Sequence, residues 1–250
     1  MENSTISKKY NLIDAHIHLA KYSAQEIKSL LKGNKYILLA VSDDLQTSYK
    51  ILNLSKLYEN IIPAVGVHPW NADKISENTL NEFKKLIVNN NIKVLGEIGL
   101  DKKFVPETFE KQLEVFKFFL ELAKEYDLAV NLHTPNAWDI ALNLLIKYDI
   151  KNAYFHWYTG PVDILNKIID NGYFIGINVA LKWQDKHRKI LEEVNLQNII
   201  TESDGPYIYK GHHLSPELIE DLIVEISQIK REDTIRVTRT IKNNFAKYLA

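Results

Sequence analysis

The stretch LIDAHIHLA, residues 12–20, begins as a buried strand and ends in two histidines that one residue separates. Side chains alternate between the two faces of a strand, so His16 and His18 are expected to point the same way. Two neighbouring imidazoles either share a metal ion or leave two half-satisfied polar rings near a core. The choice between these alternatives depends on whether further ligands occur along the chain.

Short β-branched runs alternate with amphipathic helical patterns outward from this stretch. The predicted strands are residues 12–15, 36–41, 61–65, 94–97, 129–132, 153–155, 173–177 and 199–202. The clearest helical patterns are residues 106–127, 234–250 and 215–230, the last with Ser215 as N-cap and Pro216 at the first helical position. Eight such units of about 31 residues each predict an α/β fold, a TIM-like (β/α)8 barrel. A doubly wound open sheet is the alternative, because alternation alone does not distinguish a closed sheet from an open one.

The composition fits one ordinary globular domain over residues 1–250, since no linker, charge block or low-complexity tract divides the chain. The net charge of −1 creates no global basic field that would attract nucleic acid or an anionic membrane. The absence of cysteine excludes disulfides, thiolate nucleophiles and cysteine-ligated zinc. The start, MENSTISKKYN (residues 1–11), has no apolar signal core, and no apolar run approaches the roughly 20 residues of a spanning helix. We therefore expect a cytoplasmic protein.

Polar residues gather where the predicted strands end, at the edge that forms the mouth of a barrel. They lie in the segments DAHIHL (14–19), GVHPW (66–70), GEIGLD (96–101), NLHTP (131–135), FHWYTG (155–160) and TESDGPY (201–207). A lone histidine at a strand end is more often structural than a ligand, and SDGP alone is a good turn. Their coincidence on one edge instead favours a metal site with six candidate ligands: His16, His18, Glu97, His133, His156 and Asp204.

Histidine and carboxylate ligands without sulfur suit Zn²⁺ or Mn²⁺, and the carboxylates extend the choice to Mg²⁺. Six ligands are too many for one catalytic tetrahedral site with an open position, but they suit two divalent metal ions that share a carboxylate. Glu97 lies on the middle strand of the set and is the candidate bridge. Asp204 is the candidate general base that takes a proton from the nucleophilic water.

These six segments, in this order, resemble the TatD family of metal-dependent deoxyribonucleases, from Asp14 to Tyr207. The resemblance implies a TIM-like barrel of the amidohydrolase superfamily and a two-metal phosphodiesterase that needs Mg²⁺, Mn²⁺ or Zn²⁺. It also implies roles for individual residues. His16, His18 and Asp204 would hold one metal, His133 and His156 the other, with Glu97 between them; His68 would contact the scissile phosphate, and Glu202 and Asp101 would orient the ligands.

Three departures from the family pattern concern the substrate. Thr134 and Pro135 follow His133, where better-known members carry an arginine. The segment after Tyr207 is IYKGHHLSPE, in which Lys210, His212 and His213 either supply the missing positive charge or form a solvated loop. The segment FHWYTG stands where the family more commonly has an FHxFSG-like motif. The predicted metal ligands are unaffected by these changes.

Aromatic residues stand beside several predicted ligands: Trp70, Trp138, Trp157, Tyr158 and Tyr207. They either stack unpaired bases or pack the barrel rim. We expect His68, Trp157 and Tyr207 to contact a DNA substrate that is single-stranded or frayed, because a chain with a net charge of −1 and no long basic stripe is poorly suited to the many phosphate contacts of a duplex. A lactonase or deacylase acting on a small ester or amide is the alternative enzyme, although many amidohydrolases place a lysine where this chain has Glu97. A non-catalytic nucleic-acid-binding protein with a relic metal site is a third interpretation.

Overall fold

The computed structural model describes residues 12–250, and eight parallel strands form one sheet ordered β1 to β8 along the chain. The strands are β1 Leu12–Ile17, β2 Tyr36–Val41, β3 Ile61–Val65, β4 Val94–Gly99, β5 Ala129–His133, β6 Ala153–Phe155, β7 Phe174–Asn178 and β8 Ile199–Glu202. The bounds of β2, β3, β6 and β8 match the prediction; β1, β4 and β5 extend one or two residues further at the carboxyl end, and β7 is shifted by one residue.

Hydrogen bonds connect β8 back to β1 and close the sheet. The Thr201 hydroxyl donates to the Ile13 carbonyl oxygen at 2.6 Å. The Asp204 backbone N–H donates to the His16 carbonyl oxygen at 2.8 Å. The His18 N–H donates to the carbonyl oxygen of Gly205 at 2.9 Å. A doubly wound sheet would break the sequential strand order, so the predicted TIM-like barrel is confirmed.

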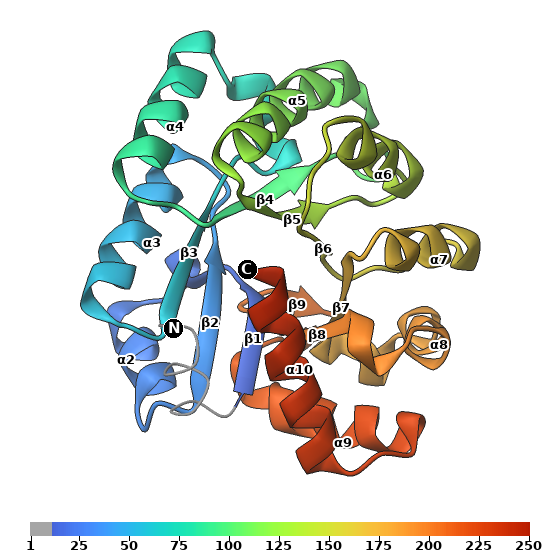
Figure 1. The fold of residues 1–250 in the computed structure, drawn as a ribbon. Helices are drawn as coiled ribbons and strands as arrows, with labels where there is room; N and C mark the ends of the chain where they lie inside the picture. Colours follow the sequence, from blue (N-terminus) through green and yellow to red (C-terminus); the bar gives the residue numbers. More distant parts are fainter. Residues whose placement is uncertain (1–11) are drawn as a thin grey trace.

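Helices surround the sheet, as Figure 1 shows. The α-helices are α2 Ala24–Leu31, α3 Leu45–Leu57, α4 Glu77–Asn89, α5 Phe109–Tyr126, α6 Trp138–Lys147, α7 Val162–Asp170, α8 Asp185–Glu193, α9 Ile219–Lys230 and α10 Thr234–Tyr248. The 3₁₀ helices are η1 Leu19–Lys21, η2 Pro69–Lys74, η3 Pro106–Thr108, η4 Val179–Trp183, η5 Leu196–Asn198 and η6 Pro216–Leu218, and a short hairpin pairs β9 Ile208–Tyr209 with β10 His212–His213. Both α9 and α10 pack against β1 and β8, and therefore cover the closing seam of the barrel.

The prediction for the start of one helix needs correction. Ser215 precedes the 3₁₀ turn η6 rather than an α-helix, and its side chain makes no capping hydrogen bond. Pro216 occupies the first position of that turn, and α9 begins three residues later at Ile219. The turn satisfies the first backbone groups locally, so no side-chain cap is required.

The strands are buried on both faces, which explains why they are continuous apolar runs such as YILLAV in β2. Their polar exceptions cluster at the carboxyl ends, where the barrel positions its functional side chains. Within residues 12–250, no helix combines the length and apolarity that a membrane crossing requires. The prediction that the N-terminal segment lacks a signal core concerns residues 1–11, which lie outside the described residues.

Candidate metal centre

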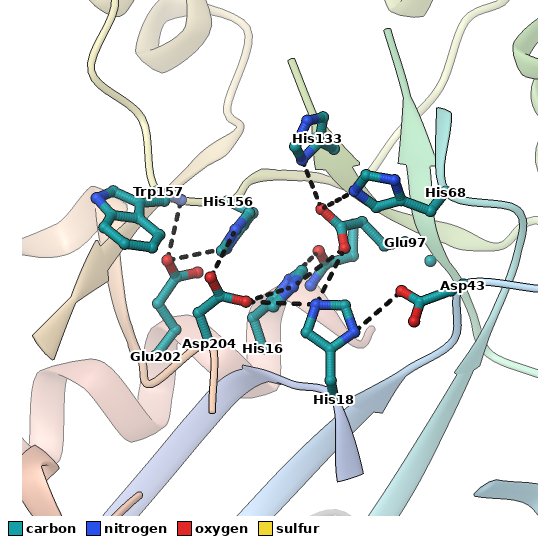
Figure 2. Close-up of polar contacts among 12 residues, drawn as sticks. His16, His18, Asp43, His68, Glu97, His133, His156, Trp157, Glu202 and Asp204 are labelled. Atoms are coloured by element: carbon teal, nitrogen blue, oxygen red, sulfur yellow. Dashed lines mark hydrogen bonds and ion pairs between the residues drawn. The ribbon is translucent and has the colours of Figure 1, made fainter. Parts of the chain in front are cut away.

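Six barrel strands bring seven polar side chains together at one rim (Figure 2). The group consists of His16, His18, His68, Glu97, His133, His156 and Asp204. His16 and Glu97 lie within β1 and β4, and His133 ends β5. The others follow their strands within a few residues, because the rim is built from the loops after the strands. The structure thus brings together all six predicted metal ligands, with His68 beside them.

Glu97 occupies the middle of this group, and its two carboxylate oxygens face different partners. Oε2 lies 3.4 Å from Nε2 of His16 and 3.4 Å from Nε2 of His18. Oε1 lies 2.9 Å from Nδ1 of His133 and 3.6 Å from Nε2 of His68. One carboxylate therefore has a separate set of nitrogens at each oxygen, which is the arrangement that a bridging ligand needs.

The spacing on the Oε2 side fits a tetrahedral cation site. Asp204 completes this side, with Oδ1 at 3.6 Å from Nε2 of His16 and 3.3 Å from Nε2 of His18. Ligand atoms at about 2.0–2.1 Å from a tetrahedral Zn²⁺ lie about 3.4 Å from one another. In addition, His16 Nε2 and Glu97 Oε2 are buried and lack any hydrogen-bond partner. Buried polar atoms left unpaired are costly, so a cation between them fits this donor set.

Four of the histidines share a second feature, which is an oxygen acceptor near the ring nitrogen that faces away from the centre. The pairs are His16 Nδ1 with Asn131 Oδ1 at 2.8 Å, His18 Nδ1 with Asp43 Oδ1 at 3.1 Å, His133 Nε2 with Asp101 Oδ2 at 2.8 Å, and His156 Nδ1 with Glu202 Oε1 at 2.9 Å. An acceptor at the outer nitrogen favours a proton there in the neutral ring. The inner nitrogen then presents a lone pair, as a metal ligand must.

Two of these outer partners, Asp43 and Asn131, were missed by the sequence analysis. Asp43 follows β2 by two residues, so the strand-end signal that identified the other carboxylates also applied to it. Asn131 is a polar residue inside the otherwise apolar β5, and its amide also donates to the Ala15 carbonyl oxygen at 2.9 Å. Nothing in its sequence position indicates which histidine it contacts.

His68 has the opposite hydrogen-bonding pattern. Its Nδ1 accepts the backbone N–H of Trp70 at 3.2 Å, which leaves the ring proton on Nε2. Burial, opposed by the charge of Glu97, lowers the pKa of His68 to about 3, so the ring is neutral at physiological pH. His68 therefore directs an N–H toward the centre, although its Nε2 lies close enough to Glu97 and His133 for a shared cation.

His156 lies on the other side of the group from His68. Its ring stacks on that of His16 with centroids 3.6 Å apart, and its Nε2 is 4.0 Å from Asp204 Oδ2. Among the described residues, the donor clusters place His156 with His16 and Asp204, and His133 with His68 and Glu97. The pairing of His133 with His156 around a second metal stays a prediction.

The group is electrostatically prepared for a cation. Burial would raise the pKa of Glu97, but the surrounding histidines outweigh it and hold this pKa well below its usual range. Burial would lower the pKa of His18 and His133, but hydrogen bonds to carboxylates outweigh it. The resulting pKa of His18 is about 10 and that of His133 about 9. Protons on these rings supply the positive charge that the buried carboxylates require.

A cavity of about 650 Å³ opens above this rim. Trp157 and Tyr207 line it, as do Thr134 and Pro135, which replace the arginine of the family pattern. Tyr158, by contrast, is fully buried and donates to the Pro161 carbonyl oxygen at 2.6 Å. Of the two alternatives for these aromatic residues, packing therefore holds for Tyr158.

The positive charge at the cavity comes from residues that the sequence analysis did not select. Lys21, Lys103 and Lys186 line the cavity, whereas the lining does not include Lys210, His212 or His213. His212 instead stacks on Trp183 with ring centroids 3.9 Å apart, and Lys210 Nζ donates to the Trp183 carbonyl oxygen. The β9–β10 hairpin thus directs its basic groups away from the centre.

Comparisons with known proteins agree with this geometry. The family described as "TatD related DNase" matches residues 13–250. An uncharacterized metal-dependent hydrolase of Haemophilus influenzae is 32% identical over 80% of this chain and 83% of its own length. One from Methanocaldococcus jannaschii is 31% identical over 94% of this chain and 96% of its own. The crystal structure of the TatD homologue YjjV from Escherichia coli K12 superposes with a TM-score of 0.85, at 24% identity and with 95% and 97% of the two chains covered, which shows the same fold.

Proposed function

The chain belongs to the TatD-related DNase family of metal-dependent hydrolases, and from that membership we propose that it is a two-metal phosphodiesterase acting on single-stranded or frayed ends of DNA. The observation that carries the proposal is the position of Glu97. Each of its oxygens lies within 3.6 Å of two imidazole nitrogens: Oε2 faces His16 and His18 at the end of β1, and Oε1 faces His68 and His133 at the ends of β3 and β5. A carboxylate so placed can bind two cations at once, which suits an in-line displacement at phosphorus.

Within this proposal, His16, His18 and Asp204 would hold one divalent ion, His133 and His156 would hold the second, and Glu97 would contribute to both sites. The nitrogen and oxygen donors accept Zn²⁺, Mn²⁺ or Mg²⁺. Such ions, when bound, lower the pKa of a water molecule and neutralise charge on the phosphate oxygens. Asp101 orients His133 through the hydrogen bond to Nε2, and Glu202 orients His156 through its contact with Nδ1 at 2.9 Å.

Asp204 is the proposed proton acceptor. Burial would raise its pKa, but the hydrogen bond from His18 and the charges of nearby histidines outweigh burial and lower it. The carboxylate is therefore ionised at neutral pH. Its Oδ1 faces the first donor set, while its Oδ2 points toward His156. A water attacking between the two donor sets would lie beside this carboxylate and could give it a proton.

His68 is the proposed phosphate contact. Its neutral ring directs Nε2–H toward the centre, as the hydrogen bond from Trp70 to Nδ1 requires. An N–H of this kind can donate to a non-bridging phosphate oxygen and stabilise the charge that develops there. The role requires no change in protonation, because the low pKa keeps the ring neutral.

The distribution of charge favours a short contact with DNA. The three cavity lysines can contact only a few phosphates, and the chain carries a net charge of −1. Duplex binding depends on many simultaneous phosphate contacts, each of which releases counterions. A single-stranded or frayed end that reaches the rim needs fewer phosphate contacts.

Hydrolysis assays with the purified chain test this proposal. Bis(p-nitrophenyl) phosphate, a labelled single-stranded oligonucleotide and its blunt duplex are compared with a panel of esters and lactones, each with Mg²⁺, Mn²⁺ or Zn²⁺. We expect metal-dependent cleavage of the phosphodiesters and faster cleavage of the single strand. Turnover of lactones or esters without any phosphodiester cleavage would refute the proposal and favour the deacylase alternative. Equal rates on single strand and blunt duplex would refute the preference for single strands.

A further inference from the structure

One side of the cavity carries an aromatic pair beside His68 and His133. Trp70 and Phe104 meet edge to face with ring centroids 5.9 Å apart, and their exposed fractions are 47% and 56%. The Trp70 ring lies 5.1 Å from that of His68 and 6.1 Å from that of His133. Lys103 Nζ lies 4.6 Å from the Phe104 centroid, which adds positive charge here. We call Trp70 and Phe104 the Trp70 wall.

The opposite side carries a second aromatic group beside His156. Trp157 packs edge to face against Tyr207 and Tyr209, with centroid distances of 6.0 Å and 5.3 Å. Its ring lies 6.1 Å from that of His156, and Tyr207 is 52% exposed. We call these three residues the Trp157 wall. Figure 2 shows Trp157 and His68 on opposite sides of the group, with Glu97 nearer to His68.

Each wall is hydrogen-bonded to the same carboxylate that orients a histidine of the centre. Asp101 Oδ2 accepts the Trp70 indole N–H at 2.7 Å and contacts His133 Nε2 at 2.8 Å. Asp101 Oδ1 also accepts the backbone N–H of Phe104 at 2.8 Å. The position of the Trp70 wall is therefore tied directly to the position of His133.

The Trp157 wall is fixed in a similar way. Glu202 Oε1 accepts the backbone N–H of Trp157 at 2.9 Å and contacts His156 Nδ1 at 2.9 Å. The Trp157 indole N–H donates to Gln184 Oε1 at 2.6 Å. Trp157 also has a φ of 42°, a conformation that bulky residues rarely adopt and that surrounding contacts must maintain. Ordinary rim packing needs no such constraint.

From these contacts, and on the premise that the protein is a phosphodiesterase, we infer that the two walls are separate base-stacking subsites that hold one nucleobase on each side of the scissile phosphate. The walls flank the predicted metal ligands and line the same cavity. Aromatic faces stack any base, and the nearby lysines can meet the adjoining phosphates. The preferred substrate is therefore a single strand that extends across the centre, so efficient cleavage requires a base on both sides of the bond.

Oligonucleotides with a single abasic site test this inference. Each oligonucleotide is a single strand in which phosphorothioate linkages leave only one phosphodiester open to cleavage. The base is removed from the nucleotide on one side of this phosphodiester in one substrate, and from the nucleotide on the other side in a second. Each missing base should reduce kcat/KM roughly 5- to 150-fold. Trp70→Ala and Tyr207→Ala should cause losses of the same order. Trp70→Phe, which keeps a ring but loses the hydrogen bond to Asp101, should recover part of the loss.

Double-mutant cycles then assign each wall to one side of the bond. Trp70→Ala should cause no further loss of kcat/KM when the base that Trp70 contacts is already missing. It should cause its full loss when the base on the other side is missing. Tyr207→Ala should show the reverse pattern. Trp183→Ala removes an indole outside the cavity lining and serves as the matched control, with unchanged response to either abasic site. All variants are also compared on bis(p-nitrophenyl) phosphate to check that they keep phosphodiesterase activity; because its nitrophenyl rings can stack as bases do, the response to the abasic position, and not the rate on this substrate, identifies a wall.

The outcomes separate this inference from the proposed function. If wild-type protein cleaves bis(p-nitrophenyl) phosphate and DNA but tolerates both abasic sites, the subsites do not exist while the phosphodiesterase assignment stands. If both wall variants respond to the same abasic position, the two-sided arrangement is wrong. If no phosphodiester is cleaved with any of the three metals, both proposals fail together.

Discussion

Metal loading should release protons, because two proposed ligands are protonated when the centre holds no cation. The pKa of His18 is about 10 and that of His133 about 9, so both rings carry a proton at pH 7.5. A metal binds only the neutral imidazole, and each of these rings belongs to a different proposed metal site. Burial would lower the pKa of His156, a proposed ligand of the second site, but the charge of Glu202 outweighs it and raises this pKa. Filling both sites at pH 7.5 should therefore release at least about two protons per chain.

The same pKa values set the pH dependence of metal affinity. Both pKa values are raised, so protons compete with the metal at any pH below them. The affinity of each site should rise about tenfold per pH unit through the neutral range. The rise should end near pH 9 at the site of His133 and near pH 10 at the site of His18. Lowering the pH should weaken both sites.

Isothermal titration calorimetry in buffers of different ionisation enthalpy counts the protons directly. Zn²⁺ is titrated into chelator-treated protein between pH 6.5 and 8. Asp43→Asn removes a carboxylate that helps to raise the pKa of His18, so its proton release should disappear at a lower pH. Asp73→Asn, at an exposed position, is the control. Release of no protons at pH 7.5, with two metals bound, would refute the assigned protonation of the centre.

Three substitutions test individual roles. Glu97→Ala should abolish hydrolysis and lower the content of both metals, measured by inductively coupled plasma mass spectrometry, while the circular dichroism spectrum stays unchanged. Retention of two metals would contradict the bridging role of Glu97. Glu121→Ala, on the exposed face of α5, is the control. His68→Ala removes a donor to the phosphate oxygen and should lower turnover roughly 10²- to 10³-fold with metal content kept, and loss of a metal would show that His68 is a ligand. Asn131→Ala removes the hydrogen bond to His16 Nδ1 and should weaken metal binding roughly 10- to 100-fold, whereas unchanged affinity would show that the contact does not orient the ring.

The order of the strands could be predicted because each strand is buried on both faces and is therefore a compact apolar run between polar helices. The closure of the sheet could not be predicted from alternation. It depends on contacts such as the Thr201 hydroxyl to the Ile13 carbonyl oxygen, which join residues almost 190 positions apart. The extra residues of β1 and β4 were missed because His16 and Gly99 do not resemble strand residues.

The candidate site divides in the same way. The six predicted ligands could be selected because each lies near or just beyond the carboxyl end of a strand, and the barrel brings such positions to one rim. The outer partners Asp43 and Asn131 could not be assigned, because a hydrogen bond to one particular ring depends on side-chain directions across strands. Trp157 and Tyr158 are neighbours in sequence, but the Trp157 ring lines the cavity and the Tyr158 ring is buried in the core. The positive φ at Trp157 separates the two directions.

The sequence by itself determined the kind of donors available, which are imidazoles and carboxylates without thiols, because the chain has no cysteine. It also determined the rim on which they gather, because they stand at the carboxyl ends of the predicted strands. The tertiary structure alone decided which nitrogen of each ring faces the centre, since that depends on the oxygen that contacts the opposite nitrogen. It also decided that lysines from η1, the loop after β4 and α8, rather than the basic residues of the β9–β10 hairpin, line the cavity. Such choices depend on distances between segments far apart in the chain, which local residue patterns do not encode.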